Sequence, residues 1–190
     1  TSPLYERKVP VKETLTLKSA TFAQGRQMGK TLILPVRWNL ATAKPVLTTN
    51  PTEKLLTNGI RGSLKYSDFE WCSWTNNDSV SFTIDLLKPE VLNTLTLGCI
   101  TNNGMAIHKP ASVKVEVSDD NSKFREAAMQ SFTPEEIFRE GNFIENLSLK
   151  LGGIQGRYVR VSAKGPGVCP ASHVRSGQAS RIFFDEVMLE

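Results

Sequence analysis

The strongest constraint on this chain is a period of two in the alternation of apolar and polar residues. Apolar side chains stand at every second position from Val80 to Leu86, and the segments 113–117, 147–151 and 159–161 repeat the pattern. Successive side chains of a β-strand point to opposite faces of a sheet, so this period predicts half-buried strands. Clusters of Gly, Asn, Asp and Pro separate the segments, which is typical of an antiparallel sandwich or barrel. We therefore expect an all-β fold.

A single short helix is expected to interrupt this pattern. Residues Thr133 to Glu136 combine a capping box with a proline at the first helical position, and Gly141 is suited to end a helix. The sequence predicts a helix of about two turns between them.

Composition and charge exclude several classes of protein. Of the 190 residues 39% are hydrophobic, which is enough for a packed core, and no apolar run approaches the roughly 20 residues of a membrane-spanning helix. Residues 1–50 hold eight basic and two acidic residues, so the net charge of +4 originates there. These basic residues are evenly spaced, which favours a solvated strand face over a nucleic-acid surface. We expect neither a nucleic-acid nor a membrane partner.

The three cysteines, Cys72, Cys99 and Cys169, point to free thiols. They show no CxxC spacing and no clustered histidine, which argues against a zinc site, and their odd number argues against a disulfide framework. Cys99 lies in an apolar run and is expected to be a small buried core residue.

A domain boundary is predicted near residues 44–52, where prolines interrupt the strand pattern. Residues 1–48 contain two or three predicted strands, too few to bury a face independently, whereas residues 49–190 contain most of the strand pattern. The opening segment Thr1 to Tyr5 reads like the interior of a longer protein, and we expect the chain to be an excerpt.

Five segments in a fixed order carry a resemblance to a known family. They are Leu56–Ser63, the tryptophans at 71 and 74, Thr83–Leu86, the hairpin 110–121, and the closing strands with Arg157-Tyr158-Val159-Arg160-Val161 and Asp185-Glu186-Val187. From about residue 53 onward the chain resembles the discoidin, or coagulation factor V/VIII type C, domain, which bacterial enzymes use as family-thirty-two carbohydrate-binding modules. The resemblance implies a jelly-roll β-sandwich over residues 49–190, preceded by a short truncated β-segment.

A narrower resemblance concerns the parent protein. The loop Gly167–His173 with Gly177, and the segments 2–5 and 22–26, are similar to the C-terminal regions of family-twenty β-N-acetylhexosaminidases of Bacteroidetes. Residues 1–48 would then be the tail of a small β-domain that follows the catalytic domain. The resemblance implies an accessory module without a catalytic site, in an extracytoplasmic protein.

The resemblance also implies a structural Ca²⁺ where the opening loop meets the last strand. By position its ligands would be the side chains of Asn58, Ser63 and Glu186 and the carbonyl near Ile60. Calcium takes six to eight oxygen ligands, and an inward-facing Glu186 needs a partner. A loop closed by hydrogen bonds alone is the alternative.

Members of the family bind sugars through loops at one end of the sandwich. Aromatic rings stack on the sugar face while planar polar groups fix its hydroxyls. The corresponding loop residues here are Tyr66, Phe69, Trp71, Asn102, Asn103, His108, His173 and Arg175. For Tyr66, Trp71 and the two histidines a structural role within the loops is an open alternative.

Three functions remain on these observations. The first is a carbohydrate-binding module that binds terminal galactose, N-acetylgalactosamine or N-acetylglucosamine weakly, next to a glycosidase domain of the same polypeptide. The second is a structural accessory domain that buttresses the catalytic domain. The third is phospholipid or protein adhesion through apolar loop tips such as Phe69 and Met105, and the mixed charges around these residues disfavour its membrane form. An independent enzyme is not expected, because the acidic residues fall on strand exteriors and turns rather than as a facing pair, and no catalytic motif is present.

Overall fold

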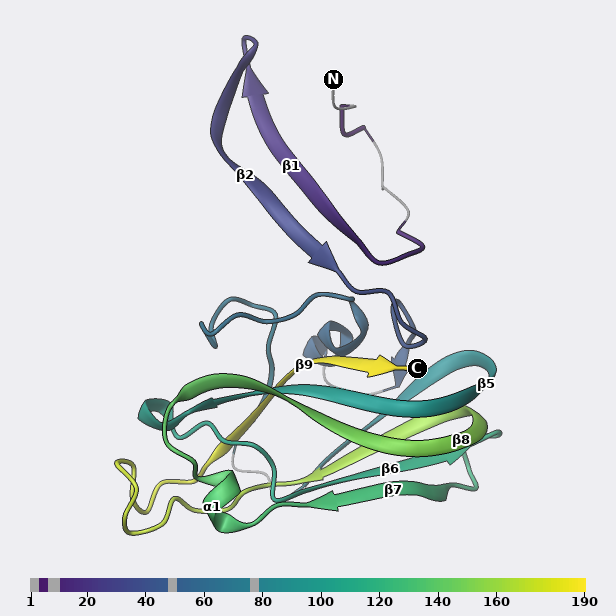
Figure 1. Cartoon of the computed structure of the whole chain (residues 1–190), viewed down its shortest axis with the longest axis vertical. Coiled ribbons are helices and arrows are strands. Elements are labelled where there is room, and N and C mark those ends of the chain that lie inside the picture. The colour runs from purple at the N-terminus through teal and green to yellow at the C-terminus, as the bar shows by residue number, and fades with distance from the viewer. Residues whose placement is uncertain (1–3, 7–10, 48–50, 76–78) are drawn as a thin grey trace. The chain divides into compact units, whose positions relative to one another are not determined.

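The computed structural model describes residues 4–6, 11–47, 51–75 and 79–190 (Figure 1). Residues 1–3 of the opening segment and residues 48–50 of the predicted boundary lie outside these ranges. The chain forms two compact units, Thr1–Trp38 and Asn39–Glu190, and each is described by itself. Within the described ranges no helix is both long enough and apolar enough to cross a membrane.

The first unit is a β-hairpin. Strands β1 (Leu15–Ala23) and β2 (Arg26–Val36) pair antiparallel, from Leu15 opposite Val36 to Ala23 opposite Arg26. The two turn residues, Gln24 and Gly25, both have positive φ, as the tight turn of a hairpin requires. Most side chains of both strands are exposed, because two strands cannot form a core.

The second unit contains the remaining elements. They are β3 (Val46–Leu47), η1 (Pro51–Thr57), β4 (Cys72–Thr75), β5 (Ser79–Asn102), η2 (Asn103–Met105), β6 (Ser112–Ser118), β7 (Arg125–Ser131), α1 (Pro134–Ile137), β8 (Asn142–Lys164) and β9 (Arg181–Leu189). The main sheet has the strand order β4-β9-β5-β8-β6-β7, and β3 also pairs with β5. Every pair in it is antiparallel.

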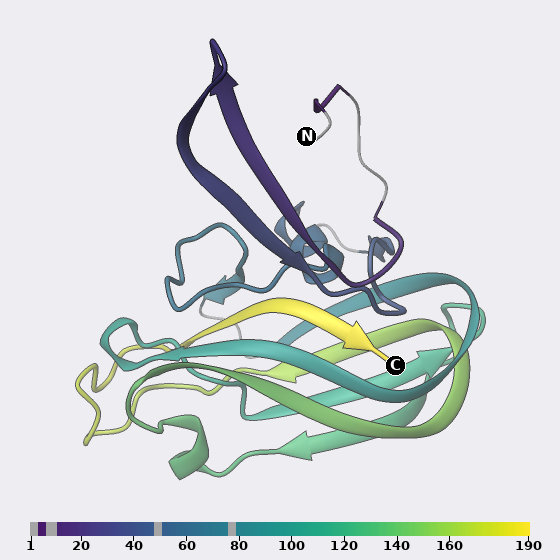
Figure 2. The same ribbon diagram turned by 45° about the horizontal axis from the view of Figure 1, so that its top comes forward.

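The two long strands, β5 and β8, turn this sheet into a sandwich. In one layer the first part of β5 pairs with the last part of β8, which pairs in turn with β6, and β6 pairs with β7. In the other layer the second part of β5 lies between β9 and the first part of β8 and pairs with both. Both strands curve over at the same end of the unit (Figures 1 and 2). The predicted all-β sandwich is therefore confirmed, with strands shared between its layers.

The bend has a local cause in each strand. In β5 the pairing register shifts between Asp85 and Glu90, and Leu87 adopts a positive φ of 71°. In β8 Gly152 and Gly153 both adopt positive φ. Glycine takes this backbone conformation without steric cost, which permits the sharp change of direction.

The alternating apolar residues meet between the layers. Val80, Phe82, Ile84 and Leu86 are at most 4% exposed, and they pack with the valines of β6 and the leucines of β8. A smaller apolar cluster of Trp71, Ile100, Ile107 and Phe183 lies beside this core, and it underlies the loop end described below.

The compact second unit begins earlier in the chain than the expected boundary at residue 49. The backbone N–H of Leu40 donates to the carbonyl of Leu189, and Val46 pairs with Ile84, so residues 40–47 are attached to the sandwich. Ala41 is fully buried in its core.

The predicted helix forms but is shorter than expected. The capping box of Thr133 and Glu136 is present, yet α1 ends at Ile137 and not near Gly141. The next residue, Phe138, leaves helical geometry, and its ring packs edge-on against the rings of His108 and His173.

Candidate functional site

Three loop segments meet at the end of the sandwich opposite the bend. They are residues 58–71 before β4, residues 103–111 after β5, and residues 165–180 between β8 and β9, which form the long loop at the left of Figure 1. Ile107 forms a parallel bridge with Arg181, and the backbone N–H of His108 donates to the carbonyl of Arg181 at 3.0 Å. These bonds join the second segment to Arg181, the first residue of β9, which directly follows the third segment.

The first segment rests on the smaller apolar cluster. The indole N–H of Trp71 donates to the carbonyl of Ser63 at 3.1 Å, and the side chain is only 6% exposed. Tyr66 is half-buried and meets the ring of Phe183 edge-on, with 6.0 Å between centroids. Trp71 therefore offers no ring face to a sugar, whereas Tyr66 keeps part of its surface in solvent.

Phe69 is the most exposed aromatic side chain of the loop end. It is 88% exposed, and its backbone adopts a φ of 69°, which is uncommon for a residue with a side chain. An exposed aromatic ring costs free energy in water, so this position fits a contact residue better than a structural one.

Two arginines are held against the second segment. Arg175 Nε donates to the carbonyl of Gly104 at 2.8 Å, and Arg181 Nη2 donates to the carbonyl of Met105. Arg181 also lies near the ring of Phe183, with 5.9 Å from Cζ to the centroid. These contacts connect Tyr66, through Phe183 and Arg181, to the segment that Arg175 also contacts. Arg181 was missed in the sequence because it reads as the first residue of a core strand.

The other predicted polar contacts differ in their exposure. Asn102 is half-buried at the end of β5, whereas Asn103, His108 and His173 are at most 9% exposed. The backbone N–H of Arg175 donates to Nδ1 of His173 at 2.9 Å. The buried residues therefore shape the loops from within, and they present little surface to a ligand.

His108, His173 and Cys169 form a buried cluster that the sequence spacing did not indicate. His108 Nε2 lies 4.0 Å from Cys169 Sγ, and the two imidazole centroids are 4.9 Å apart. Burial, followed by the neighbouring His173, lowers the pKa of His108 to about 4, so this imidazole is neutral at physiological pH. All three thiols of the chain are free and buried, and burial raises the pKa of Cys72 to about 12.

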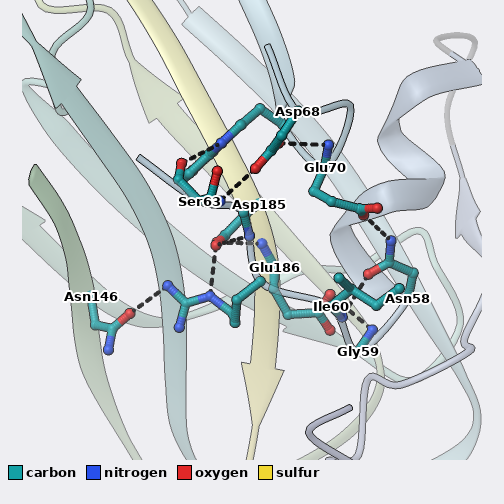
Figure 3. A network of polar contacts seen from close by, with 12 residues as sticks. Asn58, Gly59, Ile60, Ser63, Asp68, Glu70, Asn146, Asp185 and Glu186 are labelled. Carbon is teal, nitrogen blue, oxygen red and sulfur yellow. Dashed lines mark hydrogen bonds and ion pairs between the residues drawn. The ribbon is translucent and has the colours of Figure 1, made fainter. Parts of the chain in front are cut away.

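A second buried polar network joins the opening loop to β9 (Figure 3). Asp185 is fully buried, and it accepts hydrogen bonds from Arg61 Nε at 2.7 Å and from the Gly62 N–H at 2.9 Å. Arg61 also donates to Asn146 at 2.9 Å. A Cβ at Gly98 would lie 1.9 Å from Asp185 Oδ1, so only glycine leaves room for this ion pair.

Glu186 is the predicted calcium ligand that the structure places most clearly. Its Oε2 accepts the Gly59 N–H at 3.0 Å, while Oε1 has no hydrogen-bond partner among the described residues. Burial raises the pKa of Glu186 to about 9, although the Gly59 N–H opposes the shift and the amide of Asn39 lies close enough to oppose it too. A buried carboxyl group with a free oxygen is a fitting cation ligand.

The other predicted calcium ligands divide into two groups. Asn58 and Ile60 lie beside the Glu186 carboxyl group in Figure 3, and Asn58 Oδ1 accepts the Ile60 N–H at 2.8 Å. Ser63 lies apart from them, where its N–H donates to Asp68 at 2.6 Å. The structure therefore brings Asn58 and Ile60 together with Glu186, whereas Ser63 lies apart from them.

Three solved structures that share the fold are described as carbohydrate-binding domains. A chitosan-binding module from a chitosanase/glucanase of Paenibacillus sp. IK-5 has a TM-score of 0.53 and 14% identity, and the match covers 81% of this chain and 99% of the module. A fucose-binding module of Streptococcus pneumoniae has a TM-score of 0.51 and 17% identity, covering 89% and 98%. The lectin domain of lectinolysin, complexed with Lewis B antigen, has a TM-score of 0.52 and 16% identity, covering 80% and 96%. At such low identities these likenesses show the fold alone.

The sequence comparisons assign the family. A comparison with curated protein sequences finds no match. The family described as the F5/8 type C domain matches residues 42–176, which include strands β3 to β8 and the first part of the long loop. This chain belongs to the F5/8 type C, or discoidin, domain family.

Proposed function

We propose that the chain is a non-catalytic carbohydrate-binding module whose glycan site is the loop end of the sandwich. One observation carries the proposal: the exposed ring of Phe69 and the half-exposed ring of Tyr66 occur in one loop, and Tyr66 contacts Phe183, which in turn lies near Arg181. Arg181 and Arg175 donate to the carbonyls of the adjacent residues Met105 and Gly104. Aromatic faces match the C–H side of a pyranose, and guanidinium groups donate to its hydroxyls. F5/8 type C domains are typically non-catalytic, which agrees with this role.

The expected ligand is a terminal hexose or N-acetylhexosamine. The ligands named for the neighbours support a sugar, because these are fucose, chitosan and Lewis B antigen. A site with few contacts exchanges sugar–water hydrogen bonds for sugar–protein ones at little net gain. We expect dissociation constants on the order of 0.1–1 mM.

A module of this affinity works best when it is tethered to a catalytic domain. The linkage raises the local concentration of the glycan at the module, so a weak site still retains the enzyme on its substrate. We propose a glycoside hydrolase of the β-N-acetylhexosaminidase type as the parent, with residues 1–48 as the tail of its preceding small β-domain. The parent would act outside the cytoplasm, where such glycans occur.

Calorimetric titration of the whole chain, after a glycan-array screen, tests the glycan site. The Phe69→Ala and Arg175→Ala variants should weaken binding at least fivefold with unchanged melting curves, since Phe69 is almost fully exposed and Arg175 is exposed too. The matched control is Met129→Ala, which removes an exposed apolar side chain from the edge strand β7 and should leave binding unchanged. Equal binding by all three variants would contradict the proposal.

One observation favours the structural accessory role as the second candidate. Trp71, Asn103, His108 and His173 are all buried, so half of the predicted contact residues serve the loops themselves. The absence of binding to every array glycan at millimolar concentration would favour this role.

We also propose that Ca²⁺ binds at the buried carboxyl group of Glu186, with Asn58 and the backbone near Ile60 as further oxygen donors. The free Oε1 and the raised pKa of Glu186 support it, because a cation would compensate the buried negative charge. When bound, the ion would hold the opening loop to β9.

A further inference from the structure

The buried cluster of His108, Cys169 and His173 brings together three metal-ligating side chains. One ligand atom from each residue lies within 4.8 Å of the others, and the side chains are 0%, 2% and 9% exposed. His108 comes from the segment after β5, whereas Cys169 and His173 belong to the long loop before β9. His108 lies more than 60 positions before the other two residues, so no local sequence motif predicted the cluster.

Polar atoms at the cluster lack partners. His108 Nδ1 and Asn103 Oδ1 have no hydrogen bond within the part of the chain that the structure describes, although both residues are buried. The backbone of Ile137 is a weak hydrogen-bond partner of His108, outside good hydrogen-bond geometry. Buried groups of this kind are normally paired. The nitrogen of His108 that approaches Cys169 is Nε2 and not the unpaired Nδ1, so Nε2 is the ring atom available to a ligand in the cluster.

The hydrogen bonds of His173 identify its tautomer. Nδ1 accepts the N–H of Arg175, so the proton of the neutral ring is on Nε2. Nε2 lies 3.3 Å from Asn103 Nδ2, which is also a donor. Rotating the Asn103 amide by half a turn would place Oδ1 there, so that it accepts the Nε2 proton. Asn103 then fixes the ring, as outer residues do for metal-binding histidines.

We propose that His108, Cys169 and His173 bind one Zn²⁺ ion. Two imidazoles and a thiolate are the donor set of a borderline-soft ion, whereas Ca²⁺ and Mg²⁺ take oxygen. The Cys169 thiol releases its proton to solvent on binding, and Nδ1 of His173 exchanges the Arg175 N–H for the metal. The fourth position falls to water or to Ser180 Oγ, which lies 3.4 Å from the Cys169 sulfur.

The ion requires only a small contraction of the cluster. With Zn–S and Zn–N bonds of about 2.3 and 2.0 Å, tetrahedral ligand atoms lie roughly 3.3–3.6 Å apart. The Cys169–His108 contact is already 4.0 Å. A shift on the order of 1 Å completes the site, and the exposed loop that carries Cys169 and His173 can supply it.

The site would anchor the loop that presents Arg175. Residues 165–180 contain no strand of the main sheet. They are held mainly by backbone hydrogen bonds within the loop, such as those between Cys169 and Gln178 and between Ser180 and Gly167. A metal bridge to His108 ties this loop to the segment after β5. The metal is thus placed to order the loop next to the proposed glycan contacts, although its binding does not depend on a glycan.

Cobalt substitution of the chelator-treated whole chain tests the site. Co²⁺ should produce a thiolate-to-cobalt charge-transfer band and the visible bands of tetrahedral cobalt, and Zn²⁺ but not Ca²⁺ should abolish them. Cys169→Ser should remove the charge-transfer band, while the matched control Cys72→Ser, at another buried thiol, should keep it. Asn103→Ala should weaken Zn²⁺ binding about tenfold.

A measurement on the unmodified chain tests the site without relying on variants that could misfold. Zn²⁺ should slow alkylation of Cys169 at least tenfold, as mapped by mass spectrometry, and should leave the alkylation rate of Cys72 unchanged. The proposal is overturned if Co²⁺ gives no charge-transfer band with the unmodified chain, or if folded Cys169→Ser gives the same band. Equal alkylation of Cys169 with and without Zn²⁺ would overturn it as well.

Discussion

At the scale of single residues, burial separates the contact residues from those that build the loops. The sequence patterns placed Tyr66, Phe69 and Trp71 in one loop, but exposure of 88% for Phe69 and 6% for Trp71 gives them different roles. No pattern predicts this difference, since Trp71 is buried by Ile107 and Phe183, which are far away in the chain. Cys169 likewise lies close to His108 and His173 only in the folded chain, because His108 is far from it in sequence.

The calcium proposal yields a residue-scale prediction for Glu186. Millimolar Ca²⁺ should raise the melting temperature of the chelator-treated chain, because a micromolar site then contributes about 4 kcal/mol to the free energy of unfolding. Glu186→Gln should lose most of this gain. Without calcium the variant should melt close to the parent, since the pKa of about 9 keeps Glu186 neutral at pH 7 and Gln resembles the neutral acid. Identical melting curves of the parent with calcium and with chelator would contradict the proposal.

At the scale of elements, the sandwich depends on the bend shared by β5 and β8. The carboxylate of Asp85 joins the two strands there, because Arg157 donates to it from Nε at 2.7 Å and from Nη2 at 2.8 Å. Asp85 also accepts the N–H of Leu87 at 2.8 Å, where the chain takes its positive φ. The period-two pattern predicted the strands correctly, but it could not show that one strand belongs to both layers. A β-bulge interrupts the alternation without a recurring sequence pattern that would identify it.

This geometry predicts a pH-dependent contribution of Asp85 to stability. The hydrogen bonds from Arg157 lower the pKa of Asp85 in the folded chain below its ordinary value of 3.8. The stability that the Asp85 carboxylate contributes is therefore fully present above pH 3.8, and it is lost as the pH falls through the folded-state pKa. Asp85→Asn should reduce the free energy of unfolding by about 2 kcal/mol at pH 7. The difference from the parent should shrink below about pH 4.

Urea unfolding at pH 7 and pH 3 measures both quantities. Glu90→Gln is the matched control, because Glu90 pairs with the exposed Lys88 on the same strand and its loss should cost at most about 0.5 kcal/mol. A destabilisation by Asp85→Asn that is equal at both pH values would show that the ion pair is not its cause.

At the scale of the whole molecule, the fold and family were predictable from the sequence, and the arrangement of the loop end was predictable only in part. The all-β sandwich follows from the alternation of residues such as Val80 to Leu86, and the family from segments such as Arg157 to Val161. Arg181 was not predicted as a contact, because its place beside Met105 depends on the pairing of Ile107 with β9. Pairing between segments that are this far apart in the chain cannot be predicted from a local sequence pattern.

Glycan binding at the loop end can be mapped residue by residue with a nuclear magnetic resonance titration. N-Acetylglucosamine, N-acetylgalactosamine, galactose and fucose would be added separately to the isotope-labelled chain up to millimolar concentration. At least one sugar should shift the amide signals of residues 66–69, 102–105 and 175–181 in a saturable way, while those of the bend near Leu87 stay constant. Saturable shifts confined to another surface, or no shifts with any of the four sugars, would contradict glycan binding at the loop end.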